Sequence, residues 1–353
     1  MTGVVAKDKP VLLPLIPVQP DGLPTRGFGP EDRRVGEGDS AMTPTINGLH
    51  HVTAICGAPQ RNLDFYTRVL GLRFVKRTVN FDDPGTYHLY YGDEVGTPGS
   101  ALTFFAWDGL PEGRAGVGEV SLTQFSVPDG SLGFWQARLE AHGVQVFGPG
   151  SSFGESRLTG RDPDGLAFAL VVAGDGDART PWTIEGIGPE GAIRGFHGVT
   201  LTLADRTETG ELLRELFGYE LLGQEGDAFR YATPHARQAR VVDIVEQPDG
   251  VPGRQGRGSV HHVAFSVRDR AAQMAIRERL VAGGHRVTPQ IDRNYFYSIY
   301  FRSPGGVLFE VATEEPGFTV DEPVADLGRS LKLPAQHEHL RATLERSLPP
   351  LEA

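Results

Sequence analysis

Two short stretches, far apart in the chain, share one motif. The first is LHHVTAI (Leu49–Ile55) and the second is VHHVAFSV (Val260–Val267), and their second histidines lie 211 positions apart. In both, a pair of histidines precedes valine and further residues that favour β-strands. A strand-forming motif that recurs at this distance indicates an internal repeat.

A wider search finds four copies of one unit. An apolar helical pattern recurs that ends in glycine, the residue that adopts the left-handed conformation after a helix at no steric cost. The four glycines follow one another at intervals of 66 to 75 residues: Gly71, Gly143, Gly218 and Gly284. Each helical pattern follows one strand-like stretch and precedes others that turn at Pro, Gly or Asp. The sequence therefore predicts four βαβββ modules.

Such modules have to pair, because a single one leaves a sheet face bare and its edges open. We predict an α+β fold in which the four modules form two cupped, barrel-like sheets with helices outside. The predicted segments are a disordered N-terminal tail, modules one and two, a linker, modules three and four, and a C-terminal extension with a helix: 1–45, 46–175, 176–193, 194–315 and 316–353. Met42 is a candidate start of the chain.

The bulk composition narrows the class of protein. The 353 residues include 34 Lys and Arg against 45 Asp and Glu, a net charge of −11, which argues against a nucleic-acid or anionic membrane partner. No apolar run reaches the ~20 residues that span a bilayer. The single cysteine, Cys56, cannot form an intrachain disulfide, so we expect a cytoplasmic protein. A small-molecule substrate is the expected partner, and a homo-oligomer is compatible with the sequence.

Strand alternation selects three candidate metal ligands. It places His51 with Thr53, and His262 with Ala264, on the inner face of a cup. Glu310 lies among apolar residues of a predicted central strand, where a carboxylate is costly unless its charge is compensated. Two histidines and one carboxylate form the ligand set of many non-haem Fe(II) sites. Taken singly, each histidine could instead be an ordinary core residue, and Glu310 a salt-bridge partner.

The other modules lack these ligands. Aligning PGSALTF (Pro98–Phe104) with PGGVLFE (Pro304–Glu310) places Phe104 at the position of Glu310. The corresponding ligand positions hold Leu122 and Ala169 in module two and Gly198 in module three. Modules one and four therefore predict one metal site with three protein ligands.

The layout over about residues 46–315 resembles the vicinal oxygen chelate superfamily, which includes glyoxalase I and extradiol dioxygenases. Three stretches look like the hydroquinone ring-cleaving dioxygenases: FVKRTVNFDDPGTYHLYYGDEVGTPGS (Phe74–Ser100), DRNYFYSIYFRSPGGVLFEVAT (Asp292–Thr313) and GFTVDE (Gly317–Glu322). The resemblance implies an extradiol-type enzyme that opens aromatic 1,4-diols, some chlorinated, with O2. It also implies Fe(II), with Mn(II) as the alternative, on His51, His262 and Glu310. Around the substrate it implies His50, Thr53, His261, Arg293 and Tyr300.

Residue chemistry suggests how these side chains would act. His50 or His261 could take a proton from the substrate, and Tyr300 could donate a hydrogen bond to it. Arg293 could hold an oxygen anion, or could instead form an ion pair with Asp292. Two other functions stay open: a metal-dependent lyase or thiol transferase of the glyoxalase or fosfomycin type, and a non-catalytic resistance protein that binds aromatic compounds.

Overall fold

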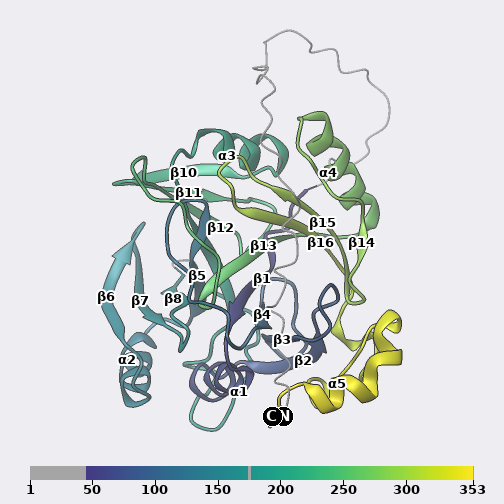
Figure 1. Ribbon diagram of the computed structural model, residues 1–353. Helices are drawn as coiled ribbons and strands as arrows, with labels where there is room; N and C mark the ends of the chain where they lie inside the picture. Colours follow the sequence, from purple (N-terminus) through teal and green to yellow (C-terminus); the bar gives the residue numbers. More distant parts are fainter. Residues whose placement is uncertain (1–44, 174–175, 353) are drawn as a thin grey trace, which may run out of the picture. The chain divides into compact units, whose positions relative to one another are not determined.

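The computed structural model describes residues 45–173 and 176–352 (Figure 1). Apart from Thr45, the tail expected over residues 1–45 lies outside these ranges, and so does the candidate start Met42. Within the described ranges, no helix combines the length and the apolar character needed to cross a membrane.

The first half of the chain forms two βαβββ modules, as predicted. Module one consists of β1 (Leu49–Cys56), α1 (Pro59–Asp64) with its π-helical continuation η1 (Phe65–Val69), β2 (Arg73–Val79), β3 (Tyr87–Gly92) and β4 (Ala101–Ala106). Module two consists of β5 (Glu119–Val127), α2 (Leu132–Ala141), β6 (Val146–Ser152), β7 (Glu155–Arg161) and β8 (Ala167–Val172).

The second half repeats the same order twice more. Module three consists of β9 (Gly195–Leu203), α3 (Thr207–Glu211) with its π-helical continuation η2 (Leu212–Leu216), β10 (Glu220–Glu225), β11 (Ala228–Ala232) and β12 (Val241–Glu246). Module four consists of β13 (Ser259–Val267), α4 (Arg270–Ala282), β14 (Ile291–Asp292), β15 (Phe296–Arg302) and β16 (Leu308–Pro316). All four predicted helix-ending glycines have positive φ, between 69° and 87°: Gly71, Gly143, Gly218 and Gly284.

The modules pair in an order that differs from the order along the chain. One curled eight-stranded sheet runs β14-β15-β16-β13-β1-β4-β3-β2 and joins module four to module one (Figure 1). The other runs β10-β11-β12-β9-β5-β8-β7-β6 and joins module three to module two. The α+β class and the two cupped sheets are thus confirmed. The sheets do not follow the predicted grouping of 46–175 and 194–315, because the first strands of modules one and four, and of two and three, pair antiparallel.

The strands at each junction form the centre of the core. All eight residues of β1 are buried, and so are all residues of β13 except His261. Phe265 on β13 packs against Phe217, which follows module three's helix, and against Phe309 on β16, with both ring centroids 4.9 Å away. Burying side chains of this size contributes roughly 1.5–3 kcal/mol each. The inner faces of the central strands are thereby fixed in place.

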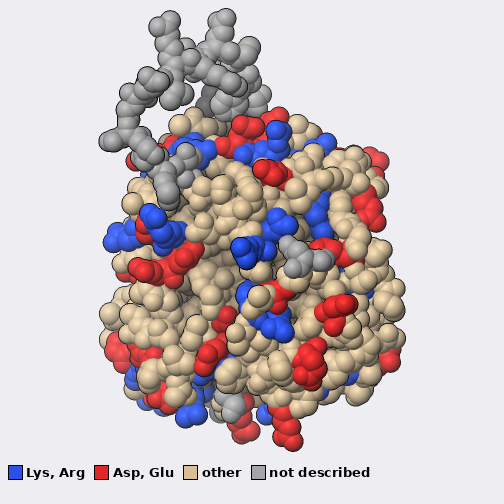
Figure 2. Space-filling model, turned by 180° about the vertical axis from the view of Figure 1, so that it is seen from behind, with Lys and Arg blue, Asp and Glu red and all other residues tan. Residues whose placement is uncertain are grey.

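The C-terminal extension covers the first cup. It contains η3 (Phe318–Val320), η4 (Val324–Asp326), η5 (Ala335–Leu340) and the predicted helix, α5 (Arg341–Ser347). Phe318 packs against Tyr90 and Tyr295 at ring-centroid distances of 5.0 and 5.1 Å. Acidic and basic side chains are interspersed over the face of the molecule drawn in Figure 2.

Candidate metal centre

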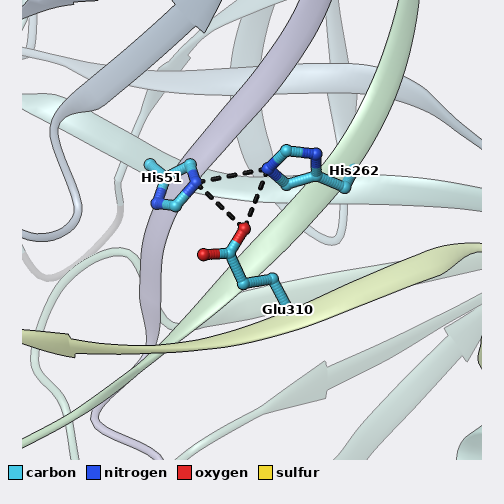
Figure 3. A group of neighbouring side chains, drawn as sticks. All are labelled: His51, His262 and Glu310. Carbon is cyan, nitrogen blue, oxygen red and sulfur yellow. Dashed lines mark hydrogen bonds and ion pairs between the residues drawn. The ribbon is translucent and has the colours of Figure 1, made fainter. Parts of the chain in front are cut away.

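Three buried side chains from three strands converge inside the first cup (Figure 3). His51 on β1 and His262 on β13 lie with their Nε2 atoms 3.3 Å apart. Oε2 of Glu310, on β16, lies 3.3 Å from Nε2 of His51 and 2.9 Å from Nε2 of His262. Among the described residues, this is the single group of His, Cys, Asp and Glu side chains that could hold a metal ion.

Two β-bulges place both histidines of each pair at the site. In the pairing of β1 with β13, Leu49 and His51 lie opposite Phe265 and Ala264, so His50 is an extra residue. On the other strand, His261 is extra in the same way. A bulge re-aims a side chain that strict alternation would turn away. As a result, Nδ1 of His50 lies 2.9 Å from Nδ1 of His51, and the Nδ1 atoms of His261 and His262 are 2.7 Å apart.

The charge states of Glu310 and His262 suit a metal ion. Although burial raises the pKa of Glu310, the neighbouring His51 and His262 outweigh it and hold that pKa well below its usual range. Burial lowers the pKa of His262 and favours the neutral ring. Ser298 donates a hydrogen bond to Oε1 of Glu310, while Oε2 has no hydrogen-bond partner among the described residues. A buried ionised oxygen without a donor, facing two imidazole nitrogens, is the environment that a bound divalent cation completes.

His50 and His261 are placed to orient the candidate ligands His51 and His262. A histidine that keeps the Nε2 lone pair for a metal carries its proton on Nδ1, and here it donates that proton to the preceding histidine. Burial, followed by the neighbouring His51, lowers the pKa of His50 to about 3. Burial, followed by His262, lowers the pKa of His261 to about 3. The predicted role of either residue as a proton acceptor is therefore not supported by its environment.

Thr53 begins a chain of hydrogen bonds across the cup. Its hydroxyl lies 2.8 Å from the hydroxyl of Thr103, which lies 2.9 Å from Nε2 of His88. The hydroxyl of Tyr90 lies 2.9 Å from Nδ1 of His88. This chain of hydrogen bonds, from Thr53 through Thr103 and His88 to Tyr90, holds the Thr53 side chain in a defined position beside the strands that carry the candidate ligands.

The structural counterpart of Glu310 in module one is Thr103, so the predicted correspondence with Phe104 is wrong by one residue. Thr53 on β1 pairs with Thr103, as Ala264 on β13 pairs with Glu310. Phe104 turns the other way into the core, where its ring lies 4.7 Å from that of Tyr66. The conclusion that module one adds no carboxylate ligand is unchanged, since threonine has none.

Arg293 and Tyr300 lie together beside the ligands. Nε of Arg293 donates to the Tyr300 hydroxyl at 3.2 Å, and Tyr300 pairs with Glu310 across β15 and β16. Burial, followed by Glu310, raises the pKa of the Tyr300 hydroxyl, which stays protonated and can donate. The guanidinium of Arg293 forms its ion pair with Asp82, at 3.1 Å, and not with Asp292 as the alternative assignment held.

The sequence-based selection missed four side chains of this site. Phe296 packs against the rings of His50 and His51, at 5.0 and 4.9 Å, and forms an apolar wall. The others are His88, Tyr90 and Ser298. Phe296 and Ser298 alternate with Tyr300 along one strand, so the period-two pattern could have identified them. His88 and Tyr90 carry no comparable signal, because only the sheet order brings β3 to this cup.

Comparisons with known proteins agree with this fold. Residues 48–170 and 195–311 match the Glyoxalase/Bleomycin resistance protein/Dioxygenase superfamily, and the chain belongs to this superfamily. It is 45% identical over 311 residues to the "Putative ring-cleaving dioxygenase MhqO" of Bacillus subtilis (strain 168), covering 88% of this chain and 98% of the relative. It is also 35% identical to the chlorohydroquinone/hydroquinone 1,2-dioxygenase of Sphingobium indicum, covering 86% and 96%. The predicted resemblance is confirmed.

Solved structures show the same architecture. A crystal structure named as a putative dioxygenase from Bacillus subtilis superimposes with a TM-score of 0.84 at 44% identity, covering 87% of this chain and 98% of the other. Glyoxalase I from Zea mays superimposes with a TM-score of 0.56 at 15% identity, covering 76% and 92%. The second likeness concerns the fold alone.

Proposed function

We propose that this chain is an Fe(II)-dependent dioxygenase that opens the ring of hydroquinone-type diols with O2, beside one hydroxyl in the extradiol manner. The observation that carries the proposal is the convergence of His51, His262 and Glu310 on one buried point. The relatives named as ring-cleaving dioxygenases, one of them acting on hydroquinone and chlorohydroquinone, support the reaction class.

The number of ligands separates this proposal from a glyoxalase-type lyase. In the fourth position, Thr103 offers a hydroxyl that is already bonded to Thr53 and His88. Three protein ligands on one side leave coordination positions open. A metal bound there would hold a diol oxygen and O2 at these positions and lower the pKa of the diol hydroxyl.

The residues around the ligands would prepare the diol. The permanent charge of Arg293 favours a diol oxygen that has lost its proton. Arg293 donates to the oxygen of Tyr300, which leaves the Tyr300 hydroxyl proton free to point at the substrate. Phe296 places an aromatic face beside His51, which suits a flat ring and excludes water.

Oxygen uptake tests the proposal directly. Protein loaded anaerobically with Fe(II) should consume one O2 per hydroquinone or chlorohydroquinone, and the ring-opened product should appear by mass spectrometry. Catechol and a glutathione hemithioacetal test the neighbouring reaction classes, and loading with Mn(II) tests the metal. Turnover of the hemithioacetal without O2 uptake, or full activity with zinc, would overturn the proposal. The His262→Ala variant controls for oxidation of hydroquinone by unbound iron.

A further inference from the structure

The second cup has the same two β-bulges as the first cup but lacks the two histidines of the candidate metal site. Where β5 pairs with β9, bulges occur at Ser121 and His197, the counterparts of His261 and His50 in the first cup. The positions of the two histidines hold Gly198 and Leu122, and the two positions that correspond to Glu310 hold Ala169 and Asp243. Bulges cluster beside binding and active sites because they re-aim side chains. Their presence in a cup without the two histidines calls for a different ligand.

A buried charged network occupies the centre of this cup. Arg230 on β11 donates to both carboxylate oxygens of Asp243 on β12, at 2.8 and 2.9 Å. Gln124 donates to the same carboxylate at 3.0 Å. Arg230 also contacts Glu155, whose carboxylate lies 3.0 Å from Nε2 of His197. The strand register places Arg230 opposite Asp243, as it places Tyr300 opposite Glu310 in the first cup. In the second cup the guanidinium of Arg230 therefore compensates the charge of Asp243 and Glu155, where a metal ion would do so in the first cup.

A cavity of about 290 Å³ opens beside this network. Its charged lining consists of four arginines and two carboxylates, in a chain whose net charge is −11: Arg179, Arg230, Arg237, Arg240, Glu155 and Asp177. Both carboxylates are already paired, Asp177 with Arg179 and Glu155 with Arg230. Because Arg230 also pairs with Asp243, the four arginines face three carboxylates, and the remaining excess of positive charge favours an anionic ligand.

Two residues that line the same cavity have strained backbone conformations. The described residues include three non-glycine residues with φ near +60°, which are Phe153 (52°), Ala239 (51°) and Asn294 (68°). Phe153 and Ala239 both line the cavity, while Asn294 directly follows Arg293 of the first cup. Such conformations cost about 1–3 kcal/mol each and cluster at functional sites. The carbonyl of Ala239 accepts a hydrogen bond from the Leu49 N–H at 2.7 Å, which helps to hold this conformation.

We propose that this cavity is a second binding site, for a small organic carboxylate with an apolar body. Arg179 and Arg230 already donate to carboxylates of the chain, so the ligand's carboxylate would be held by Arg237 and Arg240, the other two arginines of the lining. The apolar body would lie against Phe153 and Leu222, which also line the cavity. The volume is at the small end of ligand sites and limits the ligand to about one aromatic ring. This inference does not depend on the proposed reaction.

Benzoate is the probe, and benzamide is its neutral counterpart of the same shape. We expect calorimetry to show saturable binding of one benzoate per chain and at least tenfold weaker binding of benzamide. The double change Arg237→Gln with Arg240→Gln should weaken benzoate binding at least tenfold. Arg157→Gln, which removes an arginine from the neighbouring cavity of the same cup, is the matched control and should leave binding unchanged. Leu222→Trp, which adds a bulky apolar side chain to the cavity lining without changing charge, should also weaken binding.

The His262→Ala variant separates the two cups. Benzoate binding should persist in it, because the second cup does not involve the metal ligands. Loss of binding in this variant would place benzoate in the first cup and overturn the inference. Absence of saturable binding, equal binding of benzamide, or unchanged affinity in both the double variant and the Leu222→Trp variant would overturn it as well.

Discussion

At the scale of single residues, the histidine pairs show how one extra residue in a strand changes the face of the sheet toward which a side chain points. Strict alternation assigns one histidine of each pair to the cup and turns the other away. The bulges at His50 and His261 bring both to the site, in different roles. The three candidate ligands could be selected from the sequence because Glu310 and the second histidines share the inward face. The orienting role did not follow, since a bulge depends on the partner strand.

Single substitutions should separate these roles. His51→Ala or His262→Ala removes a ligand and should abolish stable metal binding. His50→Ala and His261→Ala should keep metal content near that of the parent at saturating metal. They should weaken metal affinity by about 10–100-fold, since each removes the hydrogen bond that orients a ligand. Turnover should also fall. Metal analysis and activity measured on the four variants decide this; metal loss in His50→Ala with retention in His51→Ala would contradict the assignment.

The low pKa values of His50 and His261 also predict acid sensitivity of the metal-free protein. The pKa of His50 and of His261 lies at about 3 in the folded chain, below the ~6.5 of an unfolded one. As pH falls below 6.5 the unfolded chain binds protons first, so folding stability is complete above pH 6.5 and is lost towards pH 3. Each histidine should remove up to about 1.4 kcal/mol per pH unit. Chemical denaturation between pH 7 and 4.5 measures the slope.

Matched variants test whether His50 and His261 cause this dependence of the unfolding free energy on pH. His50→Gln with His261→Gln should make the loss of stability with acid shallower. His339→Gln, an exposed histidine of the C-terminal extension, should leave it as in the parent. An unchanged slope in the double variant would show that other groups govern the acid response.

At the scale of elements, the modules were predictable because their signals are local. Helix-ending glycines, apolar periodicity and turn residues all act within a few positions, and all four predicted βαβββ units form. The register between strands was less accessible. Phe104 was aligned with Glu310, whereas the pairing of β4 with β1 places Thr103 there. An error of one residue inverts the face, because side chains alternate with a period of two.

The element that covers the first cup is held by a buried ion cluster. Lys76 on β2 is fully buried and contacts Asp321, at 2.6 Å, and Glu322, both in the C-terminal extension. Lys76→Met should leave two carboxylates without their cation and cost about 3–5 kcal/mol of unfolding free energy. Lys332→Met is the matched control: its ammonium lies 3.9 Å from the same Glu322 and is partly exposed, so the loss should stay below about 1 kcal/mol. Equal losses in both variants would contradict a special role for Lys76.

At the scale of the whole molecule, the candidate ligands indicate which modules pair more reliably than the order of the modules along the chain does. Grouping consecutive modules, 46–175 and 194–315, would separate His51 from His262. The three predicted ligands require modules one and four to meet, and the sheet order joins these two modules. The order of the modules along the chain does not decide which modules pair. Each module exposes the edge of its first strand, and the first strand of any other module could pair with that edge. The ligand set resolves an ambiguity that the strand pattern leaves.

The same sheet order predicts one metal ion per chain. The first cup supplies two histidines and a carboxylate, whereas the second has Gly198 and Leu122 at the histidine positions, and its Asp243 is paired with the guanidinium of Arg230. Protein purified without oxygen should therefore contain about one Fe(II) or Mn(II) per chain. His262→Ala should abolish it, and Asp243→Asn should leave it unchanged, because Arg230 already compensates that carboxylate. Elemental analysis of the three proteins measures this, and two metal ions per chain, or loss of metal in Asp243→Asn, would show that the second cup also binds a metal.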